Sequence, residues 1–128
     1  MNKTKDEWKE ELKPEVFHIL WEKGTEPAFS GKNLKEKRIG TYLCAGCGNE
    51  LFKSNEKFDS GSGWPSFSDP YSKESVDYHI DLSHGLKRVE VLCKKCGGHL
   101  GHVFDDGPKP SKKRFCMNSL ALRFVEDK

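Results

Sequence analysis

Two short cysteine motifs constrain the fold of this chain more than any other feature of its sequence. The runs CAGCG (residues 44–48) and CKKCG (residues 93–97) are two copies of one unit, and each follows a candidate β-strand. A tight turn that ends in glycine lets backbone N–H groups point at thiolate sulfurs. Four thiolates from two such turns match the closed, tetrahedral site of a structural Zn²⁺ ion. The predicted ligands are Cys44, Cys47, Cys93 and Cys96.

Two other interpretations of these motifs remain open. A single CxxC pair is typical of thioredoxin-like redox sites, but those require a βαβ context that this sequence lacks. Alternatively, Cys93 and Cys96 could join His99 and His102 in a site of two cysteines and two histidines. That arrangement needs very short loops between its ligands and leaves the first motif without a role.

The length of the chain explains why a metal would be useful to it. A chain of 128 residues suits one domain (1–128) with a modest core, which a metal bound by two distant motifs would reinforce. Its 22 basic and 20 acidic residues are interspersed, which disfavours a nucleic-acid partner. No run approaches the roughly 20 apolar residues of a membrane span. Five cysteines without a secretory signal favour a reducing, cytoplasmic location.

Residues 1–24 carry a helical pattern. Thr4 and Glu7 form a capping box, which predicts the start of a first helix. Pro14 is suited to open a second helix, and Gly24 is the expected stop. We expect these helices to form an amphipathic arm that packs on a sheet.

Residues 39–128 change to a strand-like period and form the expected β core. In the run RVEVL (residues 88–92), two valines share one face and the charged residues share the other. Turn signals, among them residues 83–85 and 105–108, separate several short runs, which predicts an antiparallel, mainly β fold. The expected strands are residues 41–43, 51–53, 76–81, 88–92, 103–104, 114–117 and 120–125.

Cys116 is the one cysteine left after four are assigned to the metal. A lone cysteine is usually a small apolar filler of the core. In an extended strand, however, Arg114 and Asn118 share a face with Cys116, because side chains two apart point the same way. A neighbouring guanidinium lowers the pKa of a thiol and favours the nucleophilic thiolate. His99 and His102 could supply a general acid, or could equally be exposed or zinc-shell histidines.

The loop GSGWPSF (residues 61–67) is the other unusual segment. Its two glycines, proline and two aromatics can hold a flat indole at a surface. Trp64 could therefore anchor the core, or it could form with Phe67 an apolar wall for a small methyl-bearing group.

Taken together, these segments resemble the methionine-R-sulfoxide reductase B family over nearly the whole chain. The resemblance implies two antiparallel sheets of the β-tent type, N-terminal helices, and a four-cysteine zinc site remote from catalysis. The matching runs are GTEP (24–27), FSG (29–31), both cysteine motifs, SGSGWPSF (60–67), GHLGHVFD (98–105) and RFCMNS (114–119).

The resemblance also implies roles for single residues. Cys116 matches the nucleophile that attacks the sulfoxide sulfur and becomes a sulfenic acid, and His102 matches the proton donor. Trp64 matches the indole that packs on the substrate methyl group. The other implied site members are His99, Arg114, Asn118 and Asp106, for which the adjacent Asp105 is an alternative.

The chain departs from the family pattern at one position. Many members carry a resolving cysteine where this chain has Ser62. Because the other cysteines are committed to zinc, the implied recycling uses an external thiol, such as thioredoxin or a small-molecule thiol. We expect a monomer that acts on methionine-R-sulfoxide, free or protein-bound.

A zinc-stapled binding module without catalysis is the alternative function, because fold does not fix function. The trio of Cys116, Arg114 and His102 favours the enzyme, since a pure binding module would not need it.

Overall fold

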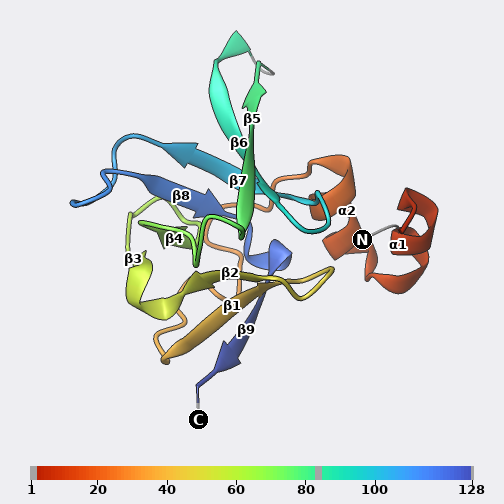
Figure 1. Ribbon diagram of the computed structural model, residues 1–128, viewed down its shortest axis with the longest axis horizontal. Helices are drawn as coiled ribbons and strands as arrows, with labels where there is room; N and C mark the ends of the chain where they lie inside the picture. The colour runs from red at the N-terminus through yellow and green to blue at the C-terminus, as the bar shows by residue number, and fades with distance from the viewer. Residues whose placement is uncertain (1–2, 83–84, 128) are drawn as a thin grey trace.

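The structure is a computed structural model that describes residues 3–82 and 85–127. It confirms the predicted fold class, with two antiparallel sheets preceded by two short helices (Figure 1). The smaller sheet has the order β2 (Glu50–Lys53), β1 (Gly40–Cys44), β9 (Leu122–Glu126). The larger sheet has the order β3 (Lys57–Phe58), β4 (Ser66–Phe67), β8 (Arg114–Met117), β7 (His99–Phe104), β6 (Arg88–Cys93), β5 (Val76–Asp81). No helix among the described residues is long and apolar enough to cross a membrane.

The first helix, α1 (Lys5–Glu11), begins as the sequence predicts. The Thr4 hydroxyl accepts a hydrogen bond from the Glu7 amide, and the Glu7 carboxylate accepts one from the Thr4 amide. This reciprocal pair satisfies two N–H groups that a helix start otherwise leaves without partners. Trp8 is the buried residue of α1, and its ring stacks on Trp21 of the second helix with centroids 5.6 Å apart.

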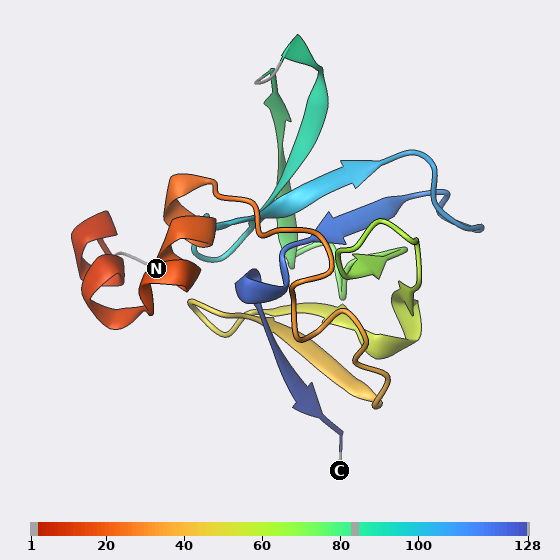
Figure 2. The same cartoon turned by 180° about the vertical axis from the view of Figure 1, so that it is seen from behind.

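The second helix, α2 (Pro14–Glu22), begins at the expected proline but ends differently from the prediction. Lys23, and not Gly24, adopts the left-handed conformation that closes the helix, with φ of 56°. A Cβ at Gly24 would meet the exposed His18 imidazole, which packs over this position. The buried side chains of α2 face β7 and the short 3-10 turn η3 (Ser119–Ala121). Figure 2 shows α2 beside this turn.

Most of the predicted strands are present, with three differences. β7 begins at His99, four residues before the predicted start, because β6 and β8 flank this glycine- and histidine-rich run and supply its hydrogen bonds. β9 begins at Leu122 because η3 occupies the preceding residues. The two-residue strands β3 and β4 were not predicted. A turn was expected at residues 83–85, and residues 83–84 of it lie outside the described residues.

An aromatic core joins the two sheets. Tyr42 and Phe52 from the smaller sheet contact Phe67 from the larger one, and the rings of Phe52 and Phe67 stack with centroids 4.4 Å apart. All three side chains are fully buried. The prediction that Phe67 forms part of a substrate wall is therefore wrong. Its position in β4 points the ring into the core, where no substrate can reach it.

The pairing of β8 positions the residues of greatest chemical interest. Cys116 lies opposite Ser66 of β4 on one side and opposite His102 of β7 on the other. Directly opposed residues of an antiparallel pair project from the same face, with Cβ atoms about 4.5–5.5 Å apart. Gly101 permits this close approach, because a Cβ there would collide with the carbonyl oxygen of Cys116.

Candidate active site

The four cysteines of the two motifs lie in one cluster, with all four sulfurs within 4.8 Å of one another. The sulfurs of Cys47 and Cys93 are 3.5 Å apart, and those of Cys44 and Cys96 are 3.8 Å apart. Zinc–sulfur bonds of about 2.3 Å in a tetrahedron place the sulfurs about 3.8 Å from one another, so the donor set fits. All five cysteines of the chain are free thiols. The cluster is therefore positioned to bind a metal ion.

The two motifs have the same local geometry. The Gly48 amide donates to the Cys44 carbonyl at 3.0 Å, and the Gly97 amide donates to the Cys93 carbonyl at 2.7 Å. Both glycines have a φ near 80°, a conformation that disfavours other residues. Since one motif follows β1 of the smaller sheet and the other follows β6 of the larger sheet, a bound metal would link both sheets.

The alternative ligand set with two histidines is not assembled. The His99 imidazole is buried against the carboxylate of Glu90, with Nδ1 and Oε2 2.6 Å apart. The His102 imidazole likewise contacts the carboxylate of Asp81, with Nε2 and Oδ2 2.8 Å apart. Both rings are thus engaged away from the cysteine cluster.

A separate cavity of about 280 Å³ opens beside Cys116. Of the predicted residues, it brings together the candidate nucleophile, the candidate acid and the indole. Its walls are formed by Thr25, Ser62, Trp64, Arg88, Gly101, His102, Phe104, Arg114, Cys116, Met117 and Asn118. Apolar and polar groups that converge on one thiol are typical of a small-molecule site.

A chain of serine hydroxyls leads to the thiol. The Ser62 hydroxyl lies 3.8 Å from the Cys116 sulfur, and Ser60 lies within hydrogen-bond distance of both Ser62 and Ser66, at 2.8 and 2.7 Å. The sequence interpretation considered Ser62 only as the place of a missing cysteine. The signal that could have revealed this chain is the clustering of three serines within seven residues of the loop that leads into β4.

Arg114 is held against the thiol by a carboxylate. Its Nε and Nη2 donate to Asp106 at 2.9 and 3.3 Å, and its guanidinium lies 4.5 Å from the centre of the Phe104 ring. Asp105 instead accepts a hydrogen bond from the exposed Lys113 at 2.8 Å. Of the two candidate acids, Asp106 is thus the one joined to the site, and it acts on Arg114 from outside the cavity.

The ionisation of Cys116 differs from the sequence-based expectation. Burial raises the pKa of the thiol, and this effect outweighs the hydrogen bond from Ser62 and the positive charge of Arg114, both of which lower it. The prediction of a lowered pKa is therefore wrong for the free protein, because the sequence could not reveal how deeply the sulfur is buried. Cys116 rests as a thiol at neutral pH.

The two histidines have carboxylate partners that the sequence interpretation missed. Burial lowers the pKa of His99 in spite of Glu90, so His99 is neutral at pH 7 and donates its Nδ1 proton to that carboxylate. The alternation of β6 had placed Glu90 with the other charged residues, on the face opposite the valines. The structure instead buries Glu90, which is 2% exposed. Asp81, which contacts His102, also accepts a hydrogen bond from Arg88 at 3.4 Å.

Asn118 supports the cavity wall. Its Oδ1 accepts from the Glu26 amide at 3.0 Å, and its Nδ2 donates to the Leu100 carbonyl at 3.1 Å. The Glu26 carbonyl in turn accepts from the Trp64 indole at 2.9 Å. Asn118 therefore holds the segment that fixes Trp64, and its amide is occupied by backbone groups.

Comparisons with known proteins relate the chain to one family. A family model described as "SelR domain" matches residues 12–126. A protein from Leptospira interrogans named peptide methionine sulfoxide reductase MsrB is 54% identical over 127 residues, 99% of this chain and 97% of its own. Proteins of the same name from Bradyrhizobium diazoefficiens and Methanosarcina mazei are 55% and 50% identical, over 94% and 99% of this chain and 87% and 91% of their own.

One solved structure extends the comparison to the fold alone. The Mis18 "Yippee-like" domain superposes with a TM-score of 0.54, covering 71% of this chain and 99% of that domain. Its sequence is 18% identical, so the likeness concerns the arrangement of strands and carries no information about chemistry.

Proposed function

Since the chain belongs to the SelR-domain family and is a methionine sulfoxide reductase, we propose that it reduces the R epimer with Cys116 as its nucleophile. The observation that supports this most is the cavity in which one thiol lies opposite His102 and which Arg114 and Trp64 also line. An apolar indole suits the substrate methyl group, whereas the cation and the imidazole suit the reacting oxygen and the thiolate.

The proposed reaction follows from these groups. As substrate fills the cavity, the Cys116 thiol passes its proton to His102, whose Nε2 lies against Asp81, and Arg114 stabilises the resulting thiolate. The thiolate attacks the sulfoxide sulfur while the oxygen takes that proton from His102. The sulfur–oxygen bond then breaks as the oxygen bonds to the Cys116 sulfur, the transient sulfur–sulfur bond breaks, and methionine departs, which leaves Cys116 as a sulfenic acid. The sulfoxide is thus reduced and the cysteine is oxidised by two electrons.

Cys116→Ser is expected to abolish the reduction of methionine-R-sulfoxide. Exchanging the thiol for a hydroxyl removes the nucleophile, so the rate should fall by several orders of magnitude, on the order of 10³-fold or more. Turnover of each epimer should be measured with dithiothreitol as reductant, with circular dichroism as a control for folding. Retained activity above about one tenth of the wild type, or turnover of the S epimer by the wild type, would contradict the proposal.

The rate should depend on pH through the Cys116 thiol. Because burial raises the pKa of Cys116, its thiolate forms only as pH rises above the range of free cysteine, about 8.5, so kcat/KM should increase with pH. His102→Gln should lower kcat/KM by roughly 10²- to 10⁴-fold, because the proposed proton donor is lost.

Alkylation of Cys116 by iodoacetamide, followed by peptide mass spectrometry, measures the thiolate without turnover. The alkylation profile should rise at the same pH in the wild type and in His102→Gln. A half-maximal rate at or below the pH found for free cysteine would refute the buried thiol.

We propose that the sulfenic acid is recycled by an external thiol such as thioredoxin. After one equivalent of methionine-R-sulfoxide, the wild type should react with dimedone and contain no disulfide. Ser62→Cys should instead form a disulfide with Cys116, because the Ser62 oxygen already lies 3.8 Å from the sulfur. Ser62→Ala is the matched control and, like the wild type, should form no disulfide. A disulfide in the wild type would have to use a cysteine of the metal cluster and would overturn this scheme.

We further propose that the four-cysteine cluster holds a structural Zn²⁺ in a reducing, cytoplasmic environment that keeps its thiols free. With all four positions filled by sulfur, the ion has no open position for substrate and serves to tie the two sheets together.

One Zn²⁺ per chain is therefore expected by elemental analysis of the wild type. Cys93→Ser should lose the metal and the cooperative thermal transition, because a buried ligand from the larger sheet is removed. Cys116→Ser is the matched control and should keep both. Folded, active protein that contains no zinc would disprove the assignment.

A further inference from the structure

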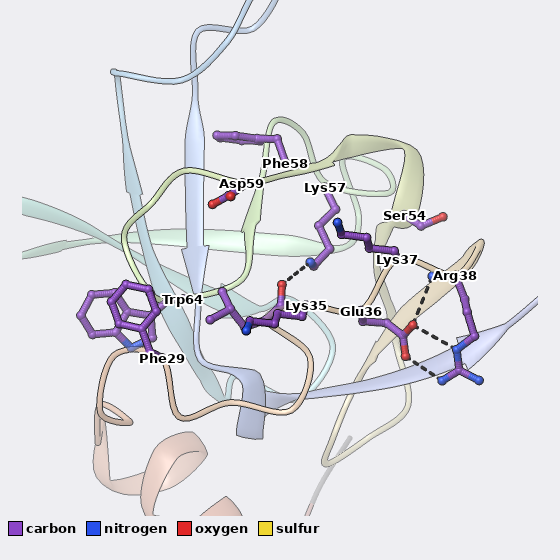
Figure 3. Close-up of a pocket in the computed structure, with 12 residues that line it drawn as sticks. Phe29, Lys35, Glu36, Lys37, Arg38, Ser54, Lys57, Phe58, Asp59 and Trp64 are labelled. Atoms are coloured by element: carbon purple, nitrogen blue, oxygen red, sulfur yellow. Dashed lines mark hydrogen bonds and ion pairs between the residues drawn. The ribbon is translucent and has the colours of Figure 1, made fainter.

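A second, larger hollow lies next to the catalytic cavity. It has a volume of about 620 Å³, compared with about 280 Å³ for the cavity beside Cys116. Trp64 lines both, so the two share a wall at this residue, and Figure 3 shows Trp64 at one end of the larger hollow. A substrate held at Cys116 by one side chain would therefore extend its neighbouring residues into this hollow. We call it the lysine groove, after Lys35, Lys37 and Lys57.

The end of the lysine groove nearest the catalytic cavity is aromatic. Phe29 and Trp64 lie together there in Figure 3, and Phe29 is 69% exposed. The Phe29 amide donates to the Gly63 carbonyl at 2.7 Å, which fixes this loop against the Trp64 loop. Phe29 also has φ of 66°, a left-handed conformation that is rare for a bulky residue. An exposed ring kept in a strained conformation beside an active site is suited to contact a ligand.

The rest of the lysine groove is positively charged. Arg38 binds the carboxylate of Glu36 at 2.6 and 3.0 Å, which lowers the pKa of Glu36 to about 2 and leaves this pair neutral overall. The three lysines then face a single further carboxylate, that of Asp59, among the residues that line the groove. Lys35 and Lys37 are exposed and free to reach a ligand.

Lys57 holds the groove in shape. Its ammonium group donates to the Leu34 carbonyl at 2.7 Å, as Figure 3 shows, and the side chain is half-buried. The bond joins the loop that carries the other two lysines to β3. The groove is therefore a formed surface with a fixed excess of positive charge, and an acidic ligand complements it.

We propose that the lysine groove binds acidic residues of a polypeptide substrate. These residues lie next to the oxidised methionine, on one side of it in the substrate sequence. This inference rests on the proposed function and adds a substrate class to it: protein-bound methionine sulfoxide in acidic segments. Successive residues of an extended chain advance by about 3.3 Å, so the positions next to the bound side chain are the first to enter the groove. Free methionine sulfoxide has no such residues and gains nothing from the groove.

The test compares N-acetyl-methionine-R-sulfoxide with short peptides that carry glutamate, glutamine or lysine on either side of the oxidised methionine. Dithiothreitol serves as reductant, which removes any contribution from a protein reductant. With the wild type at low salt, kcat/KM should be about five- to tenfold higher for glutamate than for lysine on one side, and unchanged on the other. The difference should shrink as salt is added.

The double variant Lys35→Glu/Lys37→Glu should reverse this preference and leave turnover of the acetylated amino acid unchanged. Lys5→Glu/Lys9→Glu, on α1, makes the same change in net charge away from the groove and should keep the preference. Equal effects of glutamate on both sides, or equal effects of the two double variants, would overturn the proposal in favour of general electrostatic attraction. Failure of the wild type to reduce the acetylated amino acid would instead refute the proposed function itself.

Discussion

The pairing of β8 between β4 and β7 is the constraint on which the site depends. Side chains alternate along a strand, so a shift of one residue would turn Cys116 to the opposite face and away from His102. The aromatic core supports this register, because Phe67 and Phe115 of the same strand pair must stay buried against the smaller sheet. The packing of the core and the geometry of the cavity thus require the same register of β8.

Burial of the Cys116 thiol produces a balance of opposing effects on its ionisation. The low-dielectric surroundings that raise the pKa of Cys116 also strengthen its interaction with Arg114 once a thiolate forms. Asp106 orients that guanidinium and partly offsets its charge. A resting thiol reacts slowly with adventitious oxidants, since the thiolate is the reactive form.

The sequence predicted those features of the fold that depend on interactions between residues close in the chain. The capping box of α1, the bounds of β5 and β8 and the two cysteine motifs each depend on residues close in the sequence. The carboxylate partners of the histidines depend instead on strand pairing. The burial of Glu90, for example, departs from what the alternation of β6 predicts. Phe67 shows the same limit, because a two-residue strand is too short for alternation to indicate which face is buried. Nor could the sequence reveal how far burial outweighs a neighbouring charge at Cys116.

The hydrogen bonds that run from Trp64 through Glu26 to Asn118 have a consequence for biosynthesis. They join a segment near the start of the chain to one near its end, 92 residues apart. A ribosome delivers the N-terminal part first, so the indole cannot be locked in place until the last strands have emerged. The cavity beside Cys116 is therefore among the final features to assemble, and a truncated or stalled chain carries its cysteines without a finished pocket around them.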